Sequence, residues 1–111
     1  MSGEGLCRLE DLTDPGSAGF DIARDGGPVP IMVIRVGERV WGYVNSCPHV
    51  GAPLDWVPGW FLNRARTHVL CASHSATFRI EDGFCVGGPC AGDSLTPFPV
   101  AIRDGWVVPV P

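Results

Sequence analysis

Short apolar runs rich in β-branched side chains follow one another along the chain, with glycine and proline between them. Residues 29–36 read Val-Pro-Ile-Met-Val-Ile-Arg-Val and residues 39–45 read Arg-Val-Trp-Gly-Tyr-Val-Asn, with Gly37-Glu38 between the two runs. Two such runs joined by a two-residue, glycine-containing connection predict a β-hairpin. Further strands are predicted, with Asp-Gly turns between several of them, at residues 19–23, 67–71, 76–80, 98–103 and 106–110.

Helical periodicity is weak throughout the sequence. No stretch of ten residues repeats apolar positions at the 3.6-residue period behind a capping residue, although Pro58 to Arg66 are compatible with a helical turn. Prolines such as Pro99 and Pro109 suit edge strands, which need fewer backbone donors. The pattern therefore predicts an all-β fold.

Length and composition narrow the class of protein. A chain of 111 residues suits one domain, 1–111, and a domain of this size buries roughly 65% of the surface that its unfolded chain exposes. No apolar run approaches the ~18 residues of a membrane span, so membrane insertion is not expected. The net charge is −4 and the basic residues are scattered, which argues against nucleic acid as a partner. The first residues, Met1 to Gly5, lack the features of a signal peptide, so a cytoplasmic location with reduced thiols is expected.

Two short motifs carry metal-binding chemistry: Cys47-Pro48-His49, and Cys71-Ala72-Ser73-His74 further along the chain. Each follows directly on a predicted strand, where rigid elements can hold a ligand-bearing loop. Two thiolates and two imidazoles can hold either zinc or a [2Fe-2S] centre. Because each motif pairs one cysteine with one histidine, the set suits a binuclear centre in which one iron takes both thiolates and the other both imidazoles.

At these residues the sequence resembles the Rieske family. Cys47-Pro48-His49-Val50-Gly51-Ala52-Pro53-Leu54 is similar to the family's first cluster loop, and Cys71-Ala72-Ser73-His74 to its second. Phe78 resembles the aromatic residue that follows the second loop in Rieske ferredoxins, and Gly88-Pro89 resembles the third, proline-bearing loop. The resemblance also includes residues 98–100 and 104–107, which are similar to the closing hairpin, and so spans most of the chain.

The resemblance implies a fold, a cofactor and a function. The fold is an antiparallel β-sandwich or barrel base with a small inserted cluster-binding subdomain at about residues 46–91. The cofactor is a Rieske [2Fe-2S] cluster held by Cys47, His49, Cys71 and His74, with Gly51, Pro53, Gly88 and Pro89 shaping its backbone cradle. The implied function is one-electron transfer, as the ferredoxin that carries electrons from a reductase to a terminal oxygenase. The length leaves no room for a catalytic domain, so the chain is expected not to be an enzyme.

Several departures from the family pattern are visible. The interval between His49 and Cys71 is longer than in dioxygenase ferredoxins, which suggests an insertion at Trp56 to Arg66. Ser75 stands where the family usually has glycine. Ala76 stands where the high-potential branch places a serine that donates to the cluster, so the resemblance implies a potential in the lower part of the Rieske range of about −150 to +300 mV.

Two other functions stay open on sequence alone. One is the small Rieske-like subunit of an assimilatory nitrite reductase, and the other is a zinc-stabilised interaction module. Among the residues outside the ligand set, His68 is interpreted as a solvent-facing or hydrogen-bonded side chain. Cys85 and Cys90, on either side of the Gly-Pro turn, are expected to be reduced and structural, with a local disulfide as the alternative.

Overall fold

A computed structural model describes residues 6–23, 26–46, 61–63, 65–71, 76–88 and 92–110. Within these ranges the regular structure consists of nine strands and one short 3-10 turn, so the predicted all-β class is confirmed. No helix in the described part of the chain is long and apolar enough to cross a bilayer. The elements are β1 (Cys7–Arg8), η1 (Leu9–Asp11), β2 (Gly16–Ile22), β3 (Val29–Val36), β4 (Arg39–Val44), β5 (His68–Cys71), β6 (Ala76–Arg79), β7 (Cys85–Gly87), β8 (Val100–Arg103) and β9 (Trp106–Pro109).

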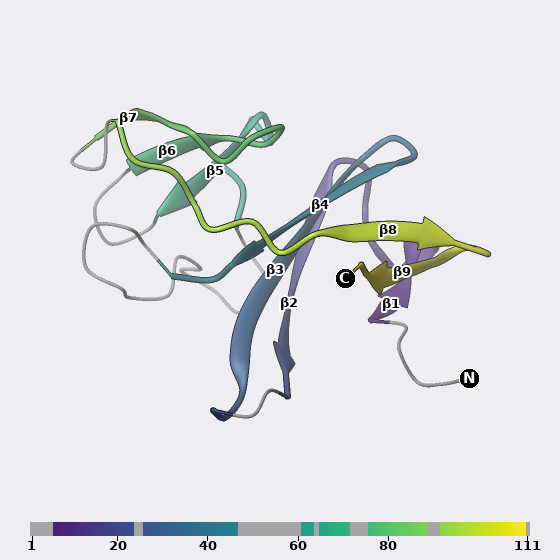
Figure 1. The fold of residues 1–111 in the computed structure, drawn as a ribbon. Coiled ribbons are helices and arrows are strands. Elements are labelled where there is room, and N and C mark those ends of the chain that lie inside the picture. Colours follow the sequence, from purple (N-terminus) through teal and green to yellow (C-terminus); the bar gives the residue numbers. More distant parts are fainter. Residues whose placement is uncertain are drawn as a thin grey trace.

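The strands form three antiparallel sheets of three strands each, in the orders β1-β9-β8, β2-β3-β4 and β5-β6-β7. Figure 1 shows the long β2-β3-β4 sheet between the other two, with β5, β6 and β7 at one end of the molecule and β1, β8 and β9 at the other. The described chain therefore starts and finishes in one sheet, and the β5-β6-β7 sheet is formed by its middle part.

Strand β3 contributes to two separate hydrophobic cores. Ile31 and Val33 belong to the core shared with β1, β2, β8 and β9, while Met32 and Ile34 belong to the core shared with β5, β6 and β7. All four side chains are fully buried. Successive side chains of a strand point to opposite faces, so a strand covered on both faces needs a continuous apolar run. This explains why residues 29–36 show no polar alternation.

The predicted strands lie where the sequence pattern places them, with small differences at their ends. The β3–β4 hairpin is confirmed, and its turn places Gly37 at a positive φ of 62°, which suits glycine. Strand β8 begins two residues later than predicted, because the amide of Phe98 donates to the carbonyl of Gly42 in β4 and does not join the β8–β9 ladder.

The helical turn considered for Pro58 to Arg66 is wrong where the structure describes it. Leu62 forms an antiparallel bridge with Val69, and the amide of Leu70 donates to the carbonyl of Phe61. Pairing with the edge of β5 satisfies these backbone groups, so residues 61–63 are extended. Residues 58–60 and 64 lie outside the described ranges.

The guanidinium of Arg35 joins the first turn of the chain to β3. It donates to the carbonyls of Leu9 (3.1 Å) and Leu12 (2.8 Å) from Nη1 and to that of Gly37 (2.8 Å) from Nε. An Arg35→Met substitution leaves three carbonyls without this donor, so we expect the free energy of unfolding to fall by about 1–3 kcal/mol. Urea denaturation measures the change. The control is R103M at an exposed position of β8, and an equal, small effect of both substitutions would contradict the prediction.

Candidate metal centre

Of the four predicted cluster ligands, the structure describes Cys71. Cys71 is the last residue of β5, pairs with Ala76 at the start of β6, and is fully buried. The ladder between these strands thus fixes both ends of the connection, residues 72–75, that carries His74. Cys47, His49 and His74 lie outside the described residues, and the described part of the chain holds no cluster of three or more metal-ligating side chains.

The surroundings of Cys71 suit a soft metal ligand. Its side chain belongs to the apolar core that includes Val69, Ala76 and Phe78, all with 0% exposure. A sulfur donor at the end of a paired strand has a fixed backbone position, and an apolar shell keeps water from it. The donor chemistry and burial of Cys71 therefore fit a [2Fe-2S] group at the loop end of the β5–β6 hairpin.

The chain leaves β4 toward Cys47 from a fixed backbone. The amide of Val44 donates to the carbonyl of Thr96 (2.8 Å), and the amide of Asn45 donates to the carbonyl of Pro30 (2.9 Å). The amide of Ser46 then donates to the carbonyl of Val44. The strand that precedes the first motif is thus held on both sides up to the residue before Cys47.

Strand β7 leads into the third predicted loop and was not predicted from the sequence. Phe84 and Val86 are exposed while Cys85 between them is buried, an alternation that is typical of a strand and that the sequence pattern carries weakly. Cys85 is a thiol whose Sγ donates to the carbonyl of Gly87 (3.1 Å), which confirms the prediction that it is reduced. Gly88 follows at a positive φ of 90°; Cys90 lies outside the described residues.

The other cradle residues predicted for the cluster, Gly51, Pro53 and Pro89, also lie outside the described residues. His68 lies at the start of β5, half-buried, and its Nδ1 is 2.9 Å from the hydroxyl oxygen of Thr67. Its interpretation as a hydrogen-bonded side chain is confirmed.

The described end of the predicted insertion packs on the protein's own β2. The amide of Phe61 donates to the hydroxyl of Ser17 (3.2 Å), and the ring of Phe61 lies over Gly19, where an added Cβ would come within 3.2 Å of the ring. Arg66 donates to the carbonyl of Pro15 (3.1 Å). The segment that returns from residues 47–60 to β5 is therefore anchored to the central sheet.

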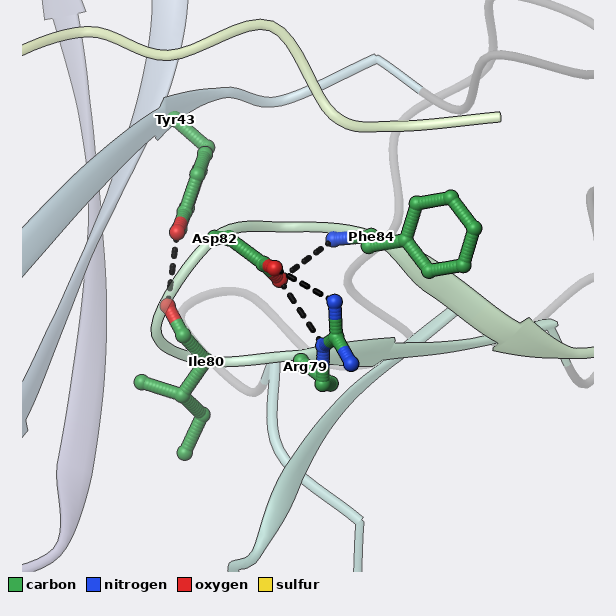
Figure 2. Close-up of polar contacts among 5 residues, drawn as sticks. All are labelled: Tyr43, Arg79, Ile80, Asp82 and Phe84. Atoms are coloured by element: carbon green, nitrogen blue, oxygen red, sulfur yellow. Dashed lines mark hydrogen bonds and ion pairs between the residues drawn. The ribbon is translucent and has the colours of Figure 1, made fainter. Parts of the chain in front are cut away.

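A polar cluster fastens the turn between β6 and β7, shown in Figure 2. Arg79 donates to both carboxylate oxygens of Asp82, which also accepts from the amide of Phe84 (3.0 Å). These hydrogen bonds lower the pKa of the Asp82 carboxyl. Tyr43 approaches the same turn from β4, and its hydroxyl donates to the carbonyl of Ile80 (2.6 Å). This contact joins residues far apart in the chain, so no local pattern indicates it.

Comparison with known proteins identifies the family. A search of the curated proteins finds no match, but the family model of the Rieske [2Fe-2S] domain matches residues 6–101. The chain belongs to the Rieske [2Fe-2S] domain family. The resemblance stated from the motifs is thereby confirmed, and the cofactor of this family is the [2Fe-2S] cluster rather than zinc.

Solved structures share the Rieske fold over almost the whole chain. The ferredoxin of carbazole 1,9a-dioxygenase from Nocardioides aromaticivorans IC177 has a TM-score of 0.76 and 23% identity, over 96% of this chain and 95% of that chain. A ferredoxin from a complex of reduced oxygenase and oxidised ferredoxin in carbazole 1,9a-dioxygenase has a TM-score of 0.73 and 23% identity, over 96% and 99%. The small subunit of a putative NADPH nitrite reductase has a TM-score of 0.67 and 17% identity, over 96% of both chains.

The Tyr43 contact makes the stability of this Rieske protein sensitive to alkali. Burial first, and then the charges of Asp82 and Glu81, raise the pKa of Tyr43 from 10.0 to about 12. Between these two values the folded chain keeps the phenolic proton and the unfolded chain loses it, so stability present below pH 10 is lost as the pH rises through about 12. We expect a loss of up to about 1.4 kcal/mol per pH unit in this window.

Denaturation at a series of alkaline pH values measures this slope. The sequence contains no lysine, because all eight basic residues other than histidine are arginine, and Tyr43 is the single tyrosine. No lysine and no second tyrosine therefore titrates between pH 10 and about 12. The matched control is the Tyr43→Phe variant, in which this slope is absent. If the Tyr43→Phe variant had the same alkaline slope as the wild type, the slope would come from another titrating group.

Proposed function

We propose that this protein is a one-electron carrier, the ferredoxin component of an oxygenase system, rather than an enzyme. The observation that carries the proposal is the Rieske fold itself, which matches a dioxygenase ferredoxin over 95% of that protein's length. The same alignment includes 96% of this chain, which supports an electron carrier of the ferredoxin kind. The proposed partners are a reductase that supplies the electron and a terminal oxygenase that receives it.

The proposed ligands are Cys47 and His49 from the first motif and Cys71 and His74 from the second, in a subdomain at about residues 46–91. The cluster, when bound, supplies a centre that accepts and releases one electron without making or breaking a substrate bond. The protein's residues hold and shield it. Cys71 supplies a buried sulfur at the end of a paired strand, and Gly88 permits the close backbone approach that donation to cluster sulfur requires.

The oxygenase partner is supported by the structural comparison. One of the similar ferredoxins was solved in a complex with the oxygenase of carbazole 1,9a-dioxygenase. By analogy with that complex, a terminal oxygenase is the proposed electron acceptor of this chain.

A second candidate function is favoured by one observation. The nitrite reductase small subunit shares the fold over 96% of both chains, although at lower identity and TM-score than the ferredoxins. In that case the protein would be a subunit of a larger enzyme. Co-purification of the native protein with a large siroheme-containing chain would favour this function over the ferredoxin.

The proposed cluster is tested by spectroscopy on anaerobically purified protein. We expect about two irons and two inorganic sulfides per chain, and an EPR spectrum of the dithionite-reduced protein with the low average g-value of mixed cysteine and histidine ligation. A His74→Cys substitution shifts the spectrum toward the all-thiolate type and lowers the potential. Stoichiometric zinc, or a spectrum that H74C leaves unchanged, would contradict the proposed ligand set.

A further inference from the structure

Tyr43 lies between the two elements that carry the proposed ligands. It is on β4, four residues before Cys47, and its hydroxyl donates to the carbonyl of Ile80, the residue that follows β6 (Figure 2). Strand β6 begins at Ala76, directly after the connection that contains His74. One hydrogen bond thus joins the strand leading to the first motif with the strand leading away from the second.

Both ends of this hydrogen bond are shielded from water. Tyr43 and Ile80 are each 3% exposed, so water cannot take the place of the phenol without entering the core. A buried carbonyl that loses its donor keeps the full desolvation cost. A tyrosine hydroxyl is protonated, and therefore a donor, throughout the physiological range, and burial raises the pKa of Tyr43 further.

The ring of Tyr43 is seated in the turn of the β6–β7 hairpin. Gly83 in that turn has a φ of 72°, and an added Cβ there would come within 2.8 Å of Cε1 of Tyr43 and 3.1 Å of Cβ of Leu95. Only glycine therefore accepts both the backbone conformation and the contact with the ring. Ring and hydroxyl together determine where the hairpin turn sits on β4.

A backbone connection runs beside this side chain. The amide of Val44 donates to the carbonyl of Thr96, and the amide of Leu95 donates to the carbonyl of Gly83. The segment between them therefore spans from β4 to the same hairpin turn. Tyr43 adds a side-chain hydrogen bond to this backbone connection, so the turn of the β6–β7 hairpin is joined to β4 by both its backbone and a side chain.

We propose that Tyr43 is a positioning residue, which sets the placement of the β5–β6–β7 hairpins relative to β4 and thereby the separation of the two cluster-binding motifs. The inference rests on the proposed function. Without the phenolic hydroxyl, the motifs take a wider range of separations, and the cluster experiences a wider range of geometries. Because the same ligands remain, the cluster still forms, but it is held less uniformly and lost more readily.

The Tyr43→Phe variant tests this proposal, because it keeps the ring and removes the hydroxyl. We expect broadened EPR lines in the reduced protein and an iron-release rate to a chelator that rises about fivefold, a factor typical of one lost buried hydrogen bond. Hydrogen exchange at the amides of Gly83 and Leu95 accelerates in parallel. G83A, which displaces the ring instead, changes the line width and the release rate in the same direction.

The matched control is Val107→Ala, which removes buried volume from the other core and leaves the β6–β7 turn untouched. Iron release is compared at temperatures equally far below each variant's melting point, so that a general loss of stability is cancelled, and the EPR line widths are compared in frozen solutions prepared identically. Equal line widths and release rates in Y43F and V107A would overturn the positioning role while leaving the proposed function intact. If the wild-type protein itself contained no iron–sulfur cluster, the proposed function would fail first.

Discussion

We expect the replacement of Cys71 with alanine to abolish the cluster, so that the purified protein is colourless and contains background amounts of iron and sulfide. Cys71 is fully buried at the end of β5, where the paired Ala76 fixes its backbone, and an alanine in its place carries no atom that can bind iron. A cluster held by four protein ligands does not persist when one thiolate is lost without replacement. Iron and sulfide analysis and the visible spectrum measure the result.

The control for this experiment is a second buried cysteine in the same sheet. Cys85 is 1% exposed, and its thiol donates to the carbonyl of Gly87 within its own strand. Cys85→Ala removes a similar volume and keeps the proposed ligand set, so the cluster is retained. Full retention of iron in C71A, or its complete loss in C85A, would contradict the assignment of ligands.

Replacing Gly42 with alanine destabilises the fold by about 3 kcal/mol or more, because the new methyl group meets the backbone rather than a movable side chain. An added Cβ at Gly42 would lie 2.2 Å from the carbonyl oxygen of Phe98. The amide of Phe98 donates to the carbonyl of Gly42, so separating the two segments to relieve the collision also breaks this hydrogen bond. Urea denaturation followed by circular dichroism measures the change.

The control glycine lies in strand β7. Among the described residues, no atom lies within 4 Å of an added Cβ at Gly87, and the φ of Gly87 is not positive. G87A is expected to leave the free energy of unfolding unchanged within about 0.5 kcal/mol. A comparable loss in both variants would mean that the close approach of Phe98 to β4 does not limit the size of residue 42.

The sequence predicts the central hairpin well because its signal is local. The apolar run at Val29–Val36 and the glycine turn that follows it are both contained in a short window. Strands β1 and β7 were missed because they are only two and three residues long, and β1 also depends on pairing with a distant segment. Cys7 in β1, for example, pairs with Val107 at the other end of the chain.

The candidate site likewise combines local features that the sequence predicts with long-range contacts that only the structure shows. The two Cys-His motifs are local patterns, and they were sufficient to indicate the family and its cofactor. The contacts that hold the motifs in place are not local: Tyr43 and Ile80 are 37 positions apart, and Arg66 reaches Pro15 across 51 positions. A tyrosine in a strand gives no sign of which distant carbonyl its hydroxyl will meet, so the supporting residues required the structure.

Strand β3 is buried on both faces, so substitutions in it affect the packing of both hydrophobic cores. Its odd-numbered apolar residues Ile31 and Val33 face one core, and Met32 and Ile34 face the other, so a slip of one residue would exchange the contents of both. The half of the molecule that contains the β5-β6-β7 sheet and the half that contains the β1-β9-β8 sheet thus both pack against β3. We therefore expect the two halves to unfold together, because unfolding of either one exposes a buried face of β3 to water.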